Sequence, residues 1–181
     1  RELASPFRTR WERLFQHGMS SAFSASHLAS KIDRREAEQA FLGGLFHDVG
    51  KAVALRAIEA LVRNGKLVET SEPVIDEVLH RIHAYPGEEF YDKWTLPGPL
   101  MTICAEHHQQ EELTDAARAL HCVGVASSFD ALLFGSATER REALRELSVS
   151  AQQLGLSDAQ LRACHAQSAM LGQRTQRTFR S

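Results

Sequence analysis

The sequence predicts an all-α protein, a bundle of about eight helices, and three observations support this fold class. Apolar residues recur at helical spacing almost throughout, beginning with Trp11, Leu14 and Phe15. No stretch keeps the strict alternation of apolar and polar residues that is typical of a half-buried strand. Capping residues, glycines and prolines also divide the chain at intervals that suit helices of ordinary length.

The clearest helix boundaries lie in the first half of the chain. Asp33, followed three residues later by Glu36, resembles a capping box and predicts a helix start. Gly65 predicts a helix end, because glycine is favoured just beyond the last helical residue. Ser71 and Pro73 predict a new start, since serine caps helices and proline is tolerated in the first helical turn.

Prolines and further caps divide the second half. Pro97 and Pro99 predict a break in the chain. After this break, Thr114 or Asp115 can cap a helix that is expected to run to about Phe134.

A last helix is predicted to start at Ser157, which forms a cap with Gln160, and to end near Gly172. Residues 173–181 are mostly polar and are expected to form a flexible tail. The predicted organisation is therefore a single helical domain, residues 1–172, followed by this tail.

Length, charge and composition exclude several classes of protein. The chain has 181 residues, of which 43% are hydrophobic and 24% charged, so it can bury its own core and does not have a disordered composition. A formal net charge of -2 provides no basic field for nucleic acid. No apolar stretch approaches the roughly 20 residues needed to span a membrane. Three widely spaced cysteines fit a reducing compartment, so a cytoplasmic location is expected.

Two pairs of adjacent polar residues mark a candidate metal site. His47 and Asp48 come at the end of an apolar helix, where a bend lets adjacent side chains converge on one ion. Gly50 is expected to supply that bend. His107 and His108 occupy the corresponding position at the end of a later helix.

Two further histidines complete the set, His17 in the first long helix and His83 shortly before a Pro-Gly pair. Four helices can thus each deliver an imidazole or a carboxylate inward. Because no thiolate is among the candidates, iron, manganese, zinc or nickel fits better than a structural zinc site built on cysteines. No motif surrounds the remaining histidines, which are expected at the surface or at helix ends: His27, His80, His121 and His165.

One segment resembles the signature of the HD superfamily of helical, metal-dependent phosphohydrolases: Ala40-Phe-Leu-Gly-Gly-Leu-Phe-His-Asp-Val-Gly-Lys51. Later segments resemble the HDOD branch, whose members are bacterial signalling output modules: His83-Ala-Tyr-Pro-Gly87, Trp94-Thr-Leu-Pro97 and His107-His108. The resemblance runs from about residue 8 to residue 172 and corresponds to the C-terminal, HD-like part of HDOD proteins. It implies an HD-domain-like helical bundle.

The resemblance also implies roles for individual residues. Asp48 would bridge between a first metal and a second one, so one or two divalent metals are expected. Lys51, one helical turn after Asp48, would neutralise phosphate charge, and these two residues are the predicted catalytic groups. The implied metal ligands are His17, His47, Asp48, His83, His107, His108 and Asp130.

The sequence departs from the family pattern at two places. Where the family has an aspartate after the His-His pair, this chain has Ser127, and Asp130 lies three residues further on the same helical face. Asp130 is therefore the expected substitute ligand. The Gly-Tyr-Pro element of the HD-GYP branch, which cleaves cyclic dinucleotides, is absent after His108.

Three functions stay open on the sequence alone. The first is a signal-transduction output module of HDOD type with a divalent-metal site that permits phosphohydrolase chemistry. The second is an active metal-dependent phosphohydrolase that acts on a nucleotide or phosphodiester. The third is a metal-free scaffold for protein interactions. The expected partners are a phosphate-containing small molecule and a signalling protein, without nucleic acid or membrane.

Overall fold

A computed structural model describes residues 7–68, 71–82, 93, 98–107, 118–135 and 137–178. These residues form helices and no strands, which confirms the predicted all-α fold class. Within the described part of the chain, no helix combines the length and the apolar character needed to cross a bilayer. Three predicted features lie outside these residues: the break at Pro97, the cap at Thr114 or Asp115 and the end of the tail, residues 179–181.

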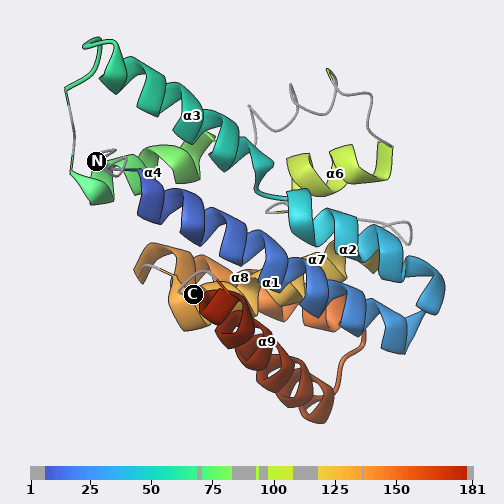
Figure 1. The fold of residues 1–181 in the computed structure, drawn as a ribbon. Helices are drawn as coiled ribbons and strands as arrows, with labels where there is room; N and C mark the ends of the chain where they lie inside the picture. Colours follow the sequence, from blue (N-terminus) through green and yellow to red (C-terminus); the bar gives the residue numbers. More distant parts are fainter. Residues whose placement is uncertain are drawn as a thin grey trace.

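The helices are arranged around α1, which packs against α2, α7 and α9 (Figure 1). Helix α8 packs on α7, and α4 packs on α3. In chain order the elements are α1 (Arg8–Ile32), the 3-10 helix η1 (Arg34–Glu36), α2 (Ala37–Phe46), α3 (Val49–Arg63), α4 (Glu72–Ile82), α6 (Gly98–Glu106), α7 (Arg118–Phe134), α8 (Ala137–Gln153) and α9 (Asp158–Thr178).

Several predicted helix boundaries are confirmed. The carboxylate of Asp33 accepts a hydrogen bond from the Arg35 backbone N–H at 3.0 Å and caps η1, which leads into α2. Helix α3 ends two residues before Gly65, whose φ of +66° is a conformation that favours glycine. Before α9, the Ser157 backbone N–H donates to Gln160 Oε1 at 2.9 Å, as in a capping box.

The last helix runs further than predicted. It continues to Thr178 and does not end near Gly172, which lies buried inside it. A Cβ atom at position 172 would lie 2.9 Å from Cε2 of Phe134 in α7. This glycine is therefore explained by the close approach of α9 to α7 and not by helix termination.

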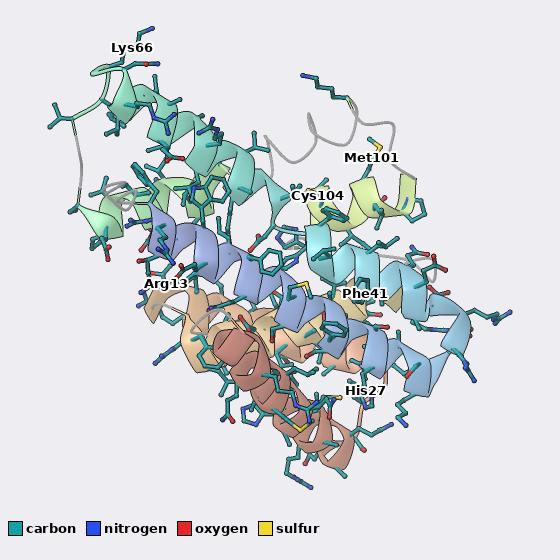
Figure 2. All side chains as sticks on the ribbon, viewed as in Figure 1. Arg13, His27, Phe41, Lys66, Met101 and Cys104 are labelled. Atoms are coloured by element: carbon teal, nitrogen blue, oxygen red, sulfur yellow. The ribbon has the colours of Figure 1, made fainter. Side chains whose placement is uncertain are left out.

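The buried apolar side chains form two clusters. The main cluster is built from the C-terminal half of α1 together with α2, α6 and α7, and includes Leu28, Ile103 and Leu120. The small cluster joins the N-terminal end of α1 to α3 and α4, and is centred on Leu55. Figure 2 shows the side chains that fill both regions. Because α1 contributes to both clusters, a residue in its middle, such as His17, lies between them.

Candidate metal centre

His47 and Asp48 form the junction between two helices. His47 is the C-cap of α2 and Asp48 is the N-cap of α3, so the chain bends at this pair. Gly50 does not supply the bend, contrary to the prediction, because it lies buried in the first turn of α3. The bend brings His47 Nε2 to 3.7 Å from Asp48 Oδ2, which confirms the expectation that the two side chains converge.

Two glycines of α2 allow this junction to lie close to other helices. A Cβ atom at Gly44 would lie 2.7 Å from the backbone of Ala22 in α1. A Cβ atom at Gly43 would lie 2.6 Å from Cδ1 of Ile103 in α6. Because backbone atoms cannot move aside, only glycine permits this approach of α2 to α1 at position 44, and the approach brings the α1 histidine, His17, within reach of the junction.

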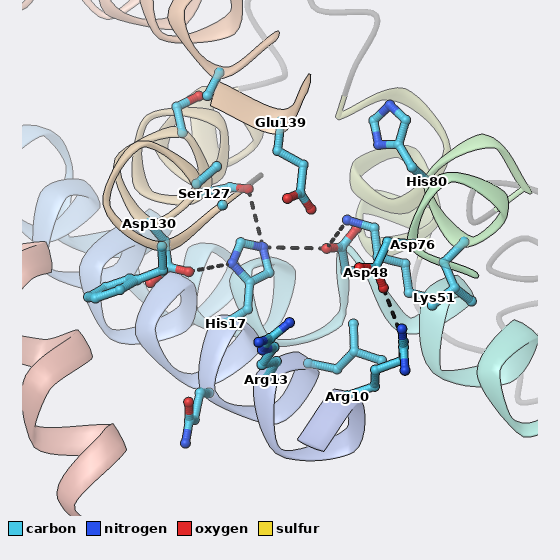
Figure 3. A pocket seen from close by; sticks show the side chains of 18 of the residues that line it. Arg10, Arg13, His17, Asp48, Lys51, Asp76, His80, Ser127, Asp130 and Glu139 are labelled. Atoms are coloured by element: carbon cyan, nitrogen blue, oxygen red, sulfur yellow. Dashed lines mark hydrogen bonds and ion pairs between the residues drawn. The ribbon is translucent and has the colours of Figure 1, made fainter. Parts of the chain in front are cut away.

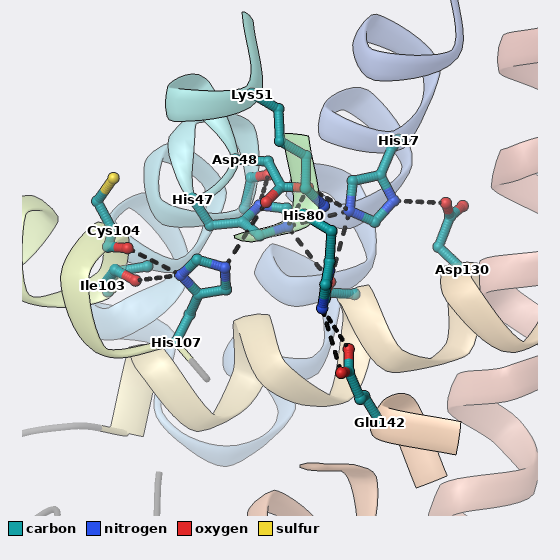
Figure 4. A network of polar contacts seen from close by, with 12 residues as sticks. His17, His47, Asp48, Lys51, His80, Ile103, Cys104, His107, Asp130 and Glu142 are labelled. Carbon is teal, nitrogen blue, oxygen red and sulfur yellow. Dashed lines mark hydrogen bonds and ion pairs between the residues drawn. The ribbon is translucent and has the colours of Figure 1, made fainter. Parts of the chain in front are cut away.

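Three side chains from these elements converge on one point, as Figure 4 shows. His17 Nε2 lies 3.0 Å from His47 Nε2 and 3.4 Å from Asp48 Oδ2. One ligand atom from each of the three residues lies within 4.8 Å of the others. We call His17, His47 and Asp48 the metal cluster below, because imidazole and carboxylate at this separation can share one ion.

Hydrogen bonds behind the imidazole rings determine which nitrogen atoms face the cluster as acceptors. His47 Nδ1 donates to the carbonyl oxygen of Gly44 at 2.9 Å, and His17 Nδ1 donates to Asp130 Oδ2 at 2.6 Å. The two Nε2 atoms therefore direct lone pairs at each other, and only a proton or a metal cation between them satisfies both. A buried carboxylate beside two such nitrogen atoms is a donor set that fits a divalent transition metal.

The pKa values in the cluster result from two opposing effects, the burial of each group and the charges of its neighbours. Burial lowers the pKa of His17, but hydrogen bonds and charge from Asp130 and Asp48 outweigh it and raise this pKa to about 10. Burial also lowers the pKa of His47 well below its usual value. For Asp48, burial raises the pKa, but the positive charge of Lys51 and the neighbouring imidazoles hold it well below its usual range. Without a metal, a proton on His17 thus balances the ionised carboxylate of Asp48.

His107 lies on the other side of Asp48. Its Nε2 is 3.6 Å from Asp48 Oδ1, and its Nδ1 donates to the carbonyl oxygen of Cys104 at 2.9 Å. The ring is only 3% exposed, so it cannot turn away into solvent. The other two predicted ligands of this part of the site, His83 and His108, lie outside the described residues.

Ser127 and Asp130 occupy different sides of His17. Ser127 Oγ lies 3.3 Å from His47 Nε2 and 3.5 Å from His17 Nε2, so it faces the metal cluster. Asp130, one helical turn later on α7, contacts the opposite ring nitrogen of His17. In this arrangement the serine, and not the aspartate, is next to the converging atoms.

A cavity of about 660 Å³ opens beside the metal cluster (Figure 3). His17, Asp48 and Ser127 contribute to its wall, and so does the predicted catalytic residue Lys51. The Lys51 ammonium group donates to Asp48 Oδ2 at 2.7 Å, so the two predicted catalytic residues form an ion pair. The volume lies within the range of ordinary small-molecule pockets.

Several residues of this cavity were not predicted from the sequence. His80 was expected at the surface without a role, but it lines the cavity, and its Nε2 lies 2.9 Å from Glu142 Oε2. Glu139 and Glu146 on the same helix also line the cavity. Glu139, Glu142 and Glu146 are spaced by three and four residues and therefore share one face of α8. Nothing in the sequence indicates that this face lies opposite α1.

One further histidine differs from expectation without belonging to the site. His121 is 4% exposed in α7, whereas a position at the surface or at a helix end was expected. Because α7 is buried along most of its length, its polar side chains are enclosed whatever their chemistry.

Comparison with known protein families gives a match over more than half of the chain. A family model with the description HDOD domain matches residues 3–110 of the chain. The matched region includes α1 to α6, and with them the metal cluster and His107. Neither the curated proteins nor the solved structures contain a match to the chain.

Proposed function

This chain belongs to the HDOD family, and from this premise we propose that it is a signal-transduction output module that holds one or two divalent transition metals and acts on a signalling protein partner. The observation that carries the metal is the pair of Nε2 atoms, from His17 and His47, that face each other 3.0 Å apart beside an ionised carboxylate. Iron, manganese, zinc and nickel all accept such nitrogen and oxygen donors.

The geometry supports distinct roles around the ion. His17, His47 and Asp48 are the ligands in this proposal. Asp48 directs Oδ2 toward these two histidines and Oδ1 toward His107, an arrangement that suits a carboxylate bridging toward a second metal. Asp130, which was expected as a ligand, instead orients His17 through its Nδ1, as carboxylates behind metal-bound histidines often do.

Phosphohydrolase activity is a second candidate function, and the cavity beside the cluster favours it. A divalent metal held there supplies Lewis-acid polarisation of a phosphoryl oxygen and lowers the pKa of water. Lys51 brings a positive charge to the point where the cavity meets Asp48, and this charge stabilises negative charge that develops on a phosphoryl group. The substrate class is a phosphate-containing small molecule.

Metal analysis of protein purified without chelator tests the first proposal. We expect close to stoichiometric metal in the wild type and its loss in Asp48→Asn and in His47→Ala. His27→Ala is the control, because His27 is an exposed histidine of the same helix as His17. Less than about a tenth of an equivalent in the wild type, after attempted loading, contradicts the metal proposal and favours a metal-free scaffold.

Hydrolysis of bis(p-nitrophenyl) phosphate with added manganese or iron tests the enzymatic proposal. We expect measurable turnover in the wild type and none in the double variant His47→Ala, Asp48→Ala. Equal rates in both proteins exclude the enzymatic activity while leaving the metal-holding module intact.

Ser127→Asp tests what the serine contributes. An added carboxylate facing His17 and His47 is expected to tighten metal binding, whereas Ser127→Ala leaves it nearly unchanged. If the aspartate variant binds metal no more tightly than the alanine variant, position 127 does not face the ion.

A further inference from the structure

The charged side chains of the cavity are mostly paired with one another. Arg10, of which only 8% of the side chain is exposed, donates from Nε to Asp76 Oδ1 at 3.1 Å. Lys51 is 2.7 Å from Asp48 Oδ2. Each of these two cations therefore already has a carboxylate partner.

The histidines of the cavity are paired as well. His17 contacts Asp130 at 2.6 Å, and His80 contacts Glu142 at 2.9 Å. These contacts also link different helices, α1 to α7 and α4 to α8. They therefore hold the wall of the cavity together, whether or not a ligand is bound.

Arg13 is the exception. Within the described residues, no ion-pair or hydrogen-bond partner lies near its guanidinium group. The side chain is exposed and lines the cavity. Arg13 stands one helical turn before His17 on the same face of α1, about 6 Å along the helix axis. Figure 3 shows its guanidinium group beside His17, on the α1 side of the cavity.

The opposite wall has the opposite charge. Helix α8 lines the cavity with Glu139, Glu142 and Glu146. Figure 3 shows Glu139 on the far side of the His17–Asp48 contact from Arg13. Among the described charged groups of the wall, the Arg13 guanidinium is the cation without a carboxylate partner, so an anionic group in the cavity can bind it without displacing an ion pair.

We propose that Arg13 binds a second phosphoryl group of a ligand whose first phosphoryl group lies at the metal cluster. The preferred ligand then carries two linked phosphoryl groups. A guanidinium group suits this task because its planar donors match phosphate oxygens in pairs. The inference rests on the proposed function, since the metal places the first group, but Arg13 does not itself touch the cluster.

The experiment measures binding of pyrophosphate and of inorganic phosphate by calorimetry, with metal-loaded and with chelator-treated protein. We expect the wild type to prefer pyrophosphate, and Arg13→Gln to weaken pyrophosphate binding about tenfold or more while changing phosphate binding little. Arg13→Lys retains part of the affinity. Arg8→Gln is the matched control, because Arg8 is an exposed arginine of the same helix that pairs with Glu12 and does not line the cavity.

The ratio of the two affinities is the decisive quantity, because a general defect in folding or metal content lowers both affinities together. An unchanged ratio in Arg13→Gln overturns the proposal, as does a wild type that does not prefer pyrophosphate. Metal content is measured on the same samples. If the wild type takes up no metal, the proposed function fails and this proposal fails with it, whereas an unchanged ratio in metal-loaded Arg13→Gln overturns the role of Arg13 alone.

Discussion

The two hydrophobic clusters support opposite sides of the site and differ in how closely they are packed. The main cluster packs α2 and α6, which lead into His47 and His107, against α1 and α7, with glycines where helices α1, α2 and α6 meet. The small cluster supports α3 and α4 and contains fewer buried side chains than the main cluster. The difference indicates that the helices leading into His47 and His107 are held more firmly than the cavity wall that carries Lys51.

The largest loss of stability is expected where an added side chain would fill the close contact between α1 and α2. Gly44→Ala would place a Cβ atom 2.7 Å from the backbone of Ala22, which cannot move aside as a side chain can. We expect the free energy of unfolding to fall by roughly 3 kcal/mol or more, measured by urea denaturation, together with loss of metal. Gly98→Ala is the control, because a Cβ atom there meets nothing within 4 Å. A Gly44→Ala protein as stable as the wild type would show that α1 and α2 are further apart.

Matched truncations in the two clusters separate stability from metal binding. Leu55→Ala in the small cluster and Leu120→Ala in the main cluster each remove a side chain that is at most 1% exposed. We expect each to cost about 2–4 kcal/mol of unfolding free energy. Metal affinity should fall clearly only in Leu120→Ala, because the main cluster supports the ligands. Equal losses of affinity in both variants would contradict the contrast between the clusters.

The pH dependence of stability tests the proton that balances the metal-free cluster. The pKa of His17 is raised to about 10 in the folded state, so its contribution to stability is complete below about pH 6.5, the usual histidine value. This contribution is lost as the pH rises toward 10. The unfolding free energy of chelator-treated protein should therefore decline between these values, and His17→Asn should remove the decline.

Metal binding should show the opposite trend with pH, because a ligating imidazole must be unprotonated. Retained metal falls as the pH drops through the neutral range, which equilibrium dialysis at several pH values can follow. Full retention at pH 4.5 would be incompatible with a site built mainly from histidine.

The smallest effect is expected at a helix cap far from the cluster. Ser157→Ala removes the hydroxyl that accepts from the Gln160 backbone N–H at 3.4 Å and should cost about 1 kcal/mol of stability. Metal content should stay unchanged, since α9 supplies no ligand. Ser157→Asp, which preserves a cap, should restore the stability measured by thermal unfolding.

Several features of the fold and the site follow from local chemistry, and the sequence predicted these well. The cap at Asp33, the end of α3 before Gly65 and the helix junction at His47 depend on residues that are neighbours along the chain. The predictions that Gly50 forms a bend and that Gly172 ends a helix were both wrong. Both glycines lie inside helices, and the close contact that explains Gly172 comes from a partner helix distant in sequence.

By itself, the sequence determined the helical class and the residues with metal-binding chemistry, because periodicity and donor type are local properties. Only the tertiary structure decided that Ser127 faces the cluster while Asp130 lies behind His17. It also decided that His80 and Arg13 share a cavity with His17. The rotation of α7 and the approach of α8 depend on the packing of whole helices, and the energy of that packing is spread over many contacts between distant parts of the chain.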